Sequence, residues 1–432
     1  MALYSQKIKT RDLDPTSFVQ NQSCQFKIPN DCSFYPNLRL VKVGSFAAGG
    51  AKYNHLAGVY ASIRHIRLTS DGMVLSQMRF ANAYLAFKAL NDSNSNNNLV
   101  KSMISKNAIG YDVKFQHGGG LESHKSHNQP VGEAGNEKKF GWLDLRTVLP
   151  ILKNMGSLDT RVFKNCVLHI EYETDPNVLV MPSNHNNAGD SMAGTAQTVT
   201  KPILVMDEIE DMAVADRLKN QLKSIVWSEI EHDRANVPAL PVQAPAGTKL
   251  RVDKSFKLNA FSGKTLGRVL FRKMTIALGT RRRLTGGLGS VAVNGEVWNY
   301  RIDGAKVFPS DLDRKSQILK LLADTYGALN IVPFGDREAV GLDYQEVNSI
   351  VDSGVPRQIG NKQGIEVGNL SYVGFGVNQK VNDFQVDFSR NATSDNRGVN
   401  GSNNLGLEIH CYAEVRKSLV VNSDGSFVIA YV

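Results

Sequence analysis

The amino-acid sequence predicts an all-β protein made of two tandem eight-stranded jelly-roll β-barrels with short inserted helices. A β-rich run, a tight turn and a second β-rich run occur once in each half, as HIRLTSDGMVLSQMR at His65–Arg79 and SVAVNGEVWNYR at Ser290–Arg301. A further β-rich segment closes each half, VLHIEYET at Val167–Thr174 and GLEIHCYA at Gly406–Ala413. Each half also offers about eight short strands, the number that a jelly roll needs. A repeat of this length indicates a duplicated architecture.

The length and composition agree with two globular domains. A chain of 432 residues fits two β-domains of roughly 200 residues each. We expect a first domain over 1–205, which includes an N-terminal arm, and a second over 206–432. The boundary lies within about 20 residues of position 205, because the composition is linker-like just before it. The net charge of +9 is modest for this length, so it favours acidic surfaces without predicting sequence-specific nucleic-acid binding.

The sequence suggests a reducing compartment. The start, MALYSQKIKT, has no apolar signal-peptide core, and no stretch approaches the ~18 apolar residues of a membrane span. We therefore expect synthesis in a cytosol-like compartment without a signal peptide or transmembrane segment. The cysteines Cys24, Cys32, Cys166 and Cys411 lack the paired spacing of a zinc site. Buried, reduced thiols are the expected state.

The elements of the first half follow from their periodicity. Cys24–Ile28, Leu38–Val43 and Tyr60–Leu68 alternate apolar and polar residues, which is the pattern of half-buried strands. Asp71–Gly72 supplies the positive φ angles of a type I′ hairpin turn. An apolar stripe at helical spacing then predicts a short helix over 80–90.

The remaining elements repeat this order. Asp144 is predicted to cap a short helix that ends near Pro150, and a strand follows at Val167–Tyr172. In the second half the patterns predict two helices and a series of strands. The helices are expected at 212–223 and 312–326, and the strands at 225–231, twice within 249–271, twice within 369–388, and in a last hairpin formed by 406–421 and 426–432.

Three basic or histidine-rich segments were considered as binding sites. The loop 116–139 places His117, His124 and His127 close together, but its glycines favour a flexible polar loop over a metal site. The run Arg281, Arg282 and Arg283 matches phosphate geometry, although a surface loop or subunit contact is favoured. The arm residues Lys7, Lys9 and Arg11 are open to three readings: a membrane surface, a neighbouring subunit, or solvent.

No catalytic, cofactor or metal residues are predicted. The acidic run Asp207, Glu208, Glu210 and Asp211 has no His, Cys or Ser at a motif spacing, so a solvated strand edge is favoured. The strand-borne histidines His65, His169 and His410 stand one per segment and are expected to be satisfied surface or core residues. The sequence therefore predicts no enzyme.

Three segments carry a resemblance to a known family. They are YASIRHIRLTSDGMVLSQMRFANAYLAFKAL at Tyr60–Leu90, WLDLRTVLPIL with FKNCVLHIEYE within Trp142–Glu173, and LGLEIHCYAEVRKSLVVNSDGSFVIAYV at Leu405–Val432. With them the chain resembles the double jelly-roll major capsid proteins of icosahedral DNA viruses and tailless phages (the PRD1–adenovirus-type lineage). Their motifs are patterns of apolar spacing, so the family has no catalytic residues to carry over.

The resemblance implies a structural role in a virion. Three chains would close into a homotrimeric, pseudo-hexameric capsomer that tiles an icosahedral shell beside neighbouring capsomers, penton and minor capsid proteins. Synthesis in the host cytosol or nucleus is implied, and contact with an internal lipid membrane stays open. Two other classes use similar barrels: a tandem jelly-roll, lectin-like or receptor-binding attachment protein, and a cupin-type enzyme with a histidine metal set on neighbouring strands.

Overall fold

The structure is a computed structural model that includes the strands and helices of both halves. The structure describes residues 8–47, 52–53, 57–91, 104–106, 140–175, 178, 180–181, 197–239, 249–275, 297–313, 315–327, 372–393, 406–422 and 425–432.

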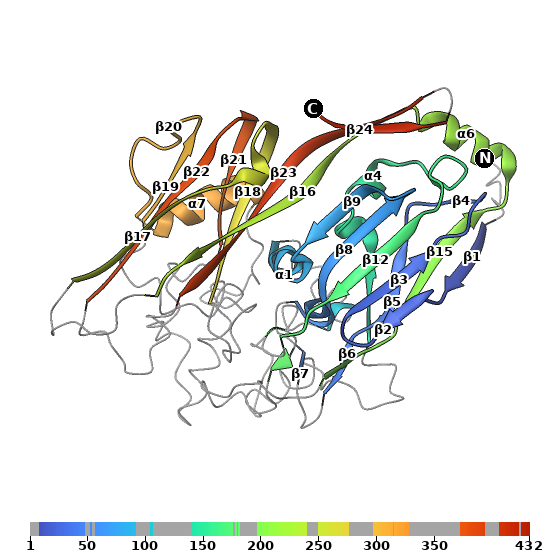
Figure 1. The fold of residues 1–432 in the computed structure, drawn as a ribbon, viewed down its shortest axis with the longest axis horizontal. Coiled ribbons are helices and arrows are strands. Elements are labelled where there is room, and N and C mark those ends of the chain that lie inside the picture. The colour runs from blue at the N-terminus through green and yellow to red at the C-terminus, as the bar shows by residue number, and fades with distance from the viewer. Residues whose placement is uncertain are drawn as a thin grey trace, which may run out of the picture.

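The first half of the chain folds into two facing antiparallel sheets (Figure 1). One sheet has the order β10-β5-β15-β4-β11 with β1 also paired to β15, and the other has the order β2-β3-β12-β8-β9. Two small sheets pair β13 with β7 and β14 with β6. The strands are β1 (Ile8–Leu13), β2 (Ser17–Val19), β3 (Ser23–Lys27), β4 (Ser33–Phe34), β5 (Arg39–Val43), β6 (Ser45–Ala47), β7 (Lys52–Tyr53), β8 (Ile63–Ser70), β9 (Met73–Arg79), β10 (Gly141–Asp144), β11 (Leu158–Asp159), β12 (Val167–Tyr172), β13 (Val180–Met181), β14 (Gln197–Val199) and β15 (Ile203–Ile209).

The second half repeats the arrangement with longer strands. Its sheets have the orders β16-β23-β18-β21 and β17-β22-β19-β20, and β24 extends the first of them beside β23. The strands are β16 (Ser224–Val237), β17 (Lys249–Lys257), β18 (Lys264–Thr275), β19 (Val297–Ile302), β20 (Ala305–Lys306), β21 (Tyr372–Val381), β22 (Phe384–Thr393), β23 (Leu407–Val421) and β24 (Phe427–Tyr431).

The two halves have the same strand topology. If the eight principal strands of each half are numbered in chain order, both halves give one sheet with the order 1-8-3-6 and one with the order 2-7-4-5. In the first half these strands are β1, β3, β5, β8, β9, β10, β12 and β15, and in the second they are β16 to β23. Two four-stranded sheets linked in this order form a jelly roll, so the predicted fold class is confirmed for both barrels.

The register of the repeat differs from the prediction. Asp71–Gly72 joins β8 to β9 with φ angles of 45° and 81°, as predicted. The equivalent hairpin of the second barrel joins β19 to β20 through Asp303–Gly304, with φ angles of 50° and 81°. The predicted turn Asn294–Gly295 lies outside the described residues. The match of β12 with β23 is wrong: β12 corresponds to β22, and β23 to β15, because alternating strands look alike until their partners are known.

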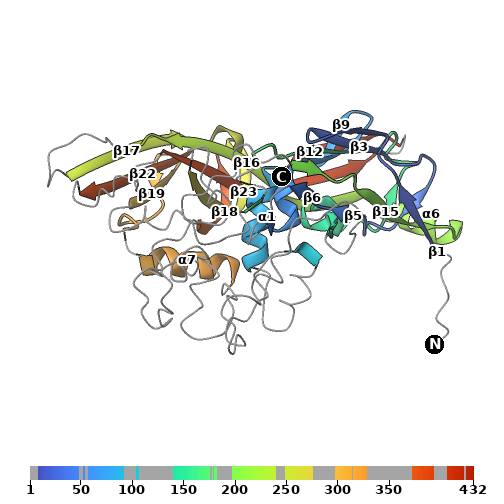
Figure 2. The ribbon, with the colours of Figure 1, turned by 90° about the horizontal axis from the view of Figure 1, so that it is seen from below.

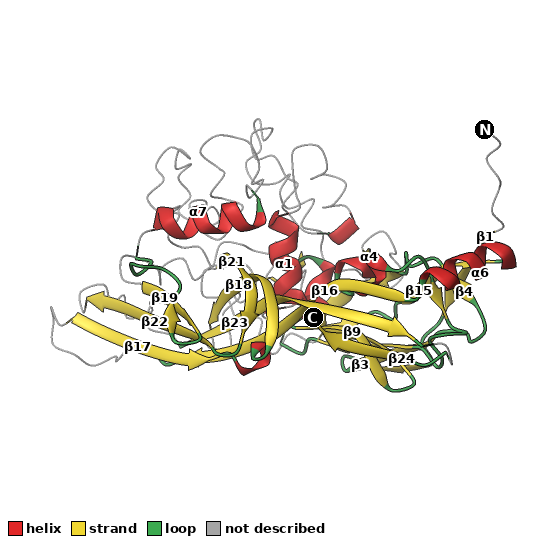
Figure 3. Cartoon of the chain, turned by 90° about the horizontal axis from the view of Figure 1, so that it is seen from above, coloured by secondary structure: helices red, strands yellow, loops and turns green. Residues whose placement is uncertain are grey.

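The helices stand at matching places in the two barrels. The α-helices are α1 (Ala81–Asn91), α4 (Ile151–Asn154), α6 (Met212–Gln221) and α7 (Lys315–Tyr326), and the 3₁₀ turns are η1 (Val59–Ser62), η4 (Leu145–Thr147) and η5 (Asn259–Phe261). Helices α1 and α7 each follow the hairpin of their barrel, and both lie on one side of the molecule (Figures 2 and 3).

Two capping predictions had different outcomes. The Asp144 side chain accepts a hydrogen bond from the Arg146 backbone and caps η4, as predicted. Pro150 does not end that helix. It precedes α4 as its N-cap residue, a position that tolerates proline because its missing N–H is not needed there.

The two barrels bury separate but adjoining cores. The second is rich in aromatic residues, with Phe271, Trp298, Tyr300, Phe375 and Phe384 packed together. The first core is continued by residues of β16, β18 and β23. Strands β16 and β23 run from the second barrel towards the first (Figure 1). The residues that the three strands contribute are Ile225, Trp227, Ile230, Leu270, Tyr412 and Leu419. Burial of apolar surface therefore joins the barrels.

Candidate functional site: the assembly residues and the contact between the barrels

The predicted basic arm contains a strand of the first barrel. Lys7 lies outside the described residues, whereas Lys9 and Arg11 belong to β1. Lys9 is exposed. Arg11 forms a two-point ion pair inside the chain, since its Nε lies 2.5 Å and its Nη2 2.9 Å from the two carboxylate oxygens of Glu208. The described part of the arm is thus a paired strand.

The acidic run is not a solvated strand edge as predicted. Its first two members lie in β15, which pairs with β1 on one side and β5 on the other. Asp207 accepts hydrogen bonds from Asn37 at 2.7 Å and Arg39 at 3.0 Å. Burial alone would raise the pKa of Glu208, but the hydrogen bonds from Arg11 and Cys32, together with the charges of Arg11 and Lys9, keep that pKa below its ordinary value. These carboxylates hold the first barrel together.

The other predicted contact residues are not among those that the structure describes. Arg281, Arg282 and Arg283 lie outside the described residues, as do the histidines of the loop 116–139.

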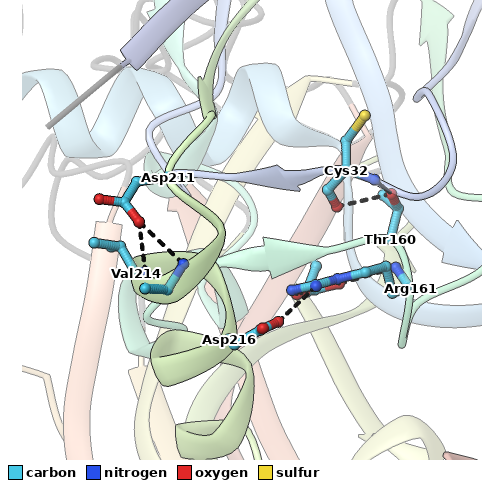
Figure 4. A network of polar contacts seen from close by, with 8 residues as sticks. Cys32, Thr160, Arg161, Asp211, Val214 and Asp216 are labelled. Carbon is cyan, nitrogen blue, oxygen red and sulfur yellow. Dashed lines mark hydrogen bonds and ion pairs between the residues drawn. The ribbon is translucent and has the colours of Figure 1, made fainter.

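Helix α6 connects the last strand of the first barrel to the first strand of the second, and polar contacts fix it (Figure 4). The Asp211 side chain caps the helix by accepting from the backbone N–H groups of Ala213 and Val214. Arg161 Nη1 lies 2.7 Å from Asp216 Oδ1 on the helix. The same guanidinium also binds the fully buried carboxylate of Asp159 at 2.5 Å. The linker is therefore tied to the first barrel.

Buried polar contacts join the two barrels beside α1. The Tyr412 hydroxyl of β23 donates to the Phe80 carbonyl at 2.8 Å. Arg272 of β18 is fully buried, and its Nη1 donates to the Ala83 carbonyl at 3.0 Å. Both carbonyls lie at the start of α1 in the first barrel. The second barrel thus supplies hydrogen bonds to backbone groups of the first.

A buried carboxylate adds a second link. Glu229 of β16 is fully buried and accepts hydrogen bonds from the Ser76 hydroxyl of β9 at 2.9 Å and the Trp227 indole at 3.0 Å. Burial raises its pKa to about 7, against the opposing effects of Lys417 and these hydrogen bonds. Neither Glu229 nor Arg272 was predicted as a contact residue, although Glu229 stands at an inward position in the alternation of β16.

The other polar groups of the described residues were compared with the ligand sets of metal sites and with the lining of a surface groove. No group of three potential metal ligands occurs among the residues that the structure describes. A groove of about 270 Å³ lies over the β17-β22-β19-β20 sheet. Within it, Asp387 already binds Arg301 at 2.8 Å and accepts from Ser255 at 2.5 Å. Arg251 also pairs with Asp253, and Lys306 with Asp311, so each carboxylate that lines the groove has a cation beside it.

The cysteines and two of the strand-borne histidines are structural. All four cysteines are free; three are buried and Cys32 is half-buried. His65 lies 3.6 Å from Glu171, and His169 is half-buried on β12. Neither histidine belongs to a ligand set among the described parts of the chain.

Comparison with known proteins gives structural matches alone. No family model matches the sequence, and no curated protein matches it by sequence. Three solved viral structures are similar along their full length. VP54 of PBCV-1 has a TM-score of 0.58 at 11% identity, over 100% of this chain and 98% of its own. The mavirus major capsid protein has 0.55 at 12%, over 99% and 90%. The Sputnik virophage structure has 0.53 at 11%, over 99% and 88%.

The fold is a double jelly roll. Both barrels are needed for these matches, because each covers nearly the whole chain. Within the double jelly roll, Arg11 stabilises the first barrel, while Glu229 and Arg272 join the two. In the part of the double jelly roll that the structure describes, no helix is long and apolar enough to cross a membrane.

Proposed function

We propose that this chain is the major capsid protein of an icosahedral virus, and that three copies form a pseudo-hexameric capsomer. The observation that carries the proposal is the full-length similarity of both barrels to the mavirus major capsid protein and to VP54. Each chain contributes two barrels of the same topology, so a trimer contains six similar barrels. Six similar units fit a site with sixfold surroundings, and closed cyclic symmetry is the common state of oligomers.

The duplicated barrels also support a rigid building block. The continuous apolar contact between the first core and strands β16 and β23 fixes the angle between the barrels. A trimer with a regular hexagonal outline needs that angle to be the same in each of its three copies. We further propose that the boundary between the barrels lies in α6, near the position 205 predicted from the sequence.

The proposed role is structural, not enzymatic. The partners would be further copies of the chain, neighbouring capsomers, and penton and minor capsid proteins of the same shell. The protein would be made in the host cytosol or nucleus and kept in the virion.

The purified chain tests the trimer directly. Light scattering coupled to size-exclusion chromatography is expected to give the mass of three chains, each of 47.4 kDa. Electron micrographs are expected to show flat particles with a hexagonal outline. A strictly monomeric protein at high concentration would overturn the proposal. A discrete oligomer that binds glycans and builds no larger array would favour the attachment protein.

The basic residues are proposed as contacts between capsomers or with an internal membrane. A test is the pair Lys7→Gln and Lys9→Gln, compared with a triple variant at Arg281, Arg282 and Arg283. Arg11 must be kept, because it pairs with Glu208 inside the barrel. Normal trimers with defective shells or lost binding to anionic vesicles would support the assembly role. Normal shells and unchanged vesicle binding in both variants would exclude it.

A further inference from the structure

A pair of histidines lies at the contact between the barrels. His232 of β16 and His410 of β23 approach each other with Nε2 and Nδ1 2.9 Å apart. His410 is 1% exposed. A hydrogen bond between two imidazole nitrogens needs one N–H and one lone pair. At least one of these two nitrogens must therefore be unprotonated, and the pair cannot persist when both rings are charged.

The histidine pair packs on a residue of the first barrel. The ring of Phe80 lies 4.8 Å from the His232 ring and 4.6 Å from the His410 ring, measured between centroids. Phe80 joins β9 to α1 with a φ of 49°, which is unusual for a bulky side chain and must be held by its surroundings. Its carbonyl accepts the hydroxyl of Tyr412. We call this arrangement of Phe80, His232, His410 and Tyr412 the Phe80 contact.

The charges that face the pair are mostly positive. Glu408 is the carboxylate among them; it lies 3.3 Å from His410 Nε2, and it also binds Arg234 at 2.8 Å. The groups that face the pair are His65 of β8, Arg79 of β9, Arg234 of β16, Arg272 of β18 and Glu408 of β23. Arg64 of β8 lies over the Phe80 ring, 5.2 Å from its centroid. A proton added to the pair would thus enter a buried site already surrounded by guanidinium groups.

We propose that the His232–His410 pair makes the contact between the two barrels sensitive to acid. With at least one ring neutral, the pair holds Phe80 and the start of α1 against the second barrel. When both rings are protonated, their hydrogen bond is lost and they repel each other and the surrounding arginines. The Phe80 contact then loosens, and the barrels gain freedom to move relative to each other.

The direction of the pH effect on the contact between the barrels follows from the surroundings of the two histidines. Burial, followed by neighbouring positive charges, lowers the pKa of His232; burial also lowers that of His410, against the opposing effect of Glu408. The separated state therefore binds more protons than the closed one as the pH falls below the ordinary histidine value of about 6.5. Glu229 acts in the opposite direction, since its raised pKa favours the closed state in acid. A test must therefore separate the titration of the two imidazoles from that of Glu229.

Hydrogen–deuterium exchange on the full chain isolates this contact. Peptides over 76–84 and 407–413 report the contact, and peptides over 298–302 report the core of the second barrel. Glu229→Gln removes the opposing titration, so this variant is the reference chain, and it is compared at about pH 7.5 and about pH 5.5 after correction for intrinsic exchange. Protection of the contact peptides is expected to fall about tenfold for the pH unit below the ordinary histidine value. The core peptides should not change.

A substitution that keeps the hydrogen bond removes the titration. His232 bonds through Nε2 and His410 through Nδ1, so His232→Gln with His410→Asn places amides near the same atoms. Made in the Glu229→Gln reference chain, this variant is expected to keep its protection in acid, whereas the control His169→Asn on the outer face of the first barrel should respond like the reference chain. If the double variant does not fold, His232→Gln alone replaces it. An equal loss of protection in the reference chain and the histidine variant would overturn the proposal, as would a reference chain that keeps full protection in acid.

Discussion

The buried carboxylate of Glu229 gives a prediction whose size can be worked out. In the folded protein its pKa is about 7, against an ordinary value of 4.5. The folded state therefore binds the proton more tightly than the unfolded state. The stability from this group is fully present below about pH 4.5 and is lost as the pH rises to 7. A difference of one pKa unit corresponds to about 1.4 kcal/mol, so the whole change amounts to about 3 kcal/mol.

The variant Glu229→Gln removes this titration while keeping the size of the side chain. The free energy of unfolding of the variant, minus that of the wild type, is expected to rise by about 3 kcal/mol between about pH 4.5 and about pH 8. The assay is chemical denaturation at a series of pH values, followed by tryptophan fluorescence. Trp227 is a suitable reporter because its indole donates to the titrating group.

Glu231, two residues further along β16, provides the matched control. Burial opposes ionisation there too, but hydrogen bonds and charges from Lys264 and Lys417 lower its pKa below the ordinary value. Glu231→Gln should therefore lose stability relative to the wild type as the pH rises. A Glu229→Gln difference that does not vary with pH, or that follows the sign of the Glu231→Gln difference, would refute the reasoning.

Three further substitutions probe the contacts that hold the fold. Tyr412→Phe removes the hydroxyl that donates to the Phe80 carbonyl, which keeps the backbone N–H of Ala83, so the variant should cost about 0.5–1.5 kcal/mol in thermal or chemical unfolding; an unchanged stability would contradict a stabilising role of this bond. Gly374→Ala should cost about 1–3 kcal/mol in free energy of unfolding, because an added Cβ would lie 2.9 Å from both the Tyr326 side chain of α7 and a backbone oxygen. Gly376→Ala on the same strand serves as the control, since there is space for its Cβ, and equal effects of the two substitutions would contradict this packing. Arg161→Ala leaves the buried carboxylate of Asp159 without its cation and should cost about 3 kcal/mol in chemical unfolding; a loss below about 1 kcal/mol would count against the ion pair.

The sequence predicted elements well where one local pattern decides the outcome. The hairpin at Asp71–Gly72 and the cap at Asp144 need only a few adjacent residues, and both predictions are confirmed. The predicted register of the repeat is wrong because β12 and β23 share the same alternation of apolar residues and differ only in their partner strands. Local patterns do not contain that information.

The candidate site depended even more on distant contacts. Ser76 and Glu229 are 153 positions apart in the chain, and Ala83 and Arg272 are 189 apart. Such pairs become visible only when the barrels meet. The arm residue Arg11 illustrates the same limit. Its charge suggested an outside partner, whereas the fold places Glu208 beside it.

The shared core has a consequence for the order in which the protein folds. Leu419 of β23 is fully buried in the first core, and Phe427 of β24 packs edge-on against Phe163 at 5.3 Å between ring centroids. A ribosome makes the chain from its N-terminus, and domains usually fold in that order. The first barrel is an exception, since its apolar surface stays partly uncovered until more than 400 residues have been synthesised. A nascent chain therefore cannot finish one barrel and begin to associate while the other is still being made.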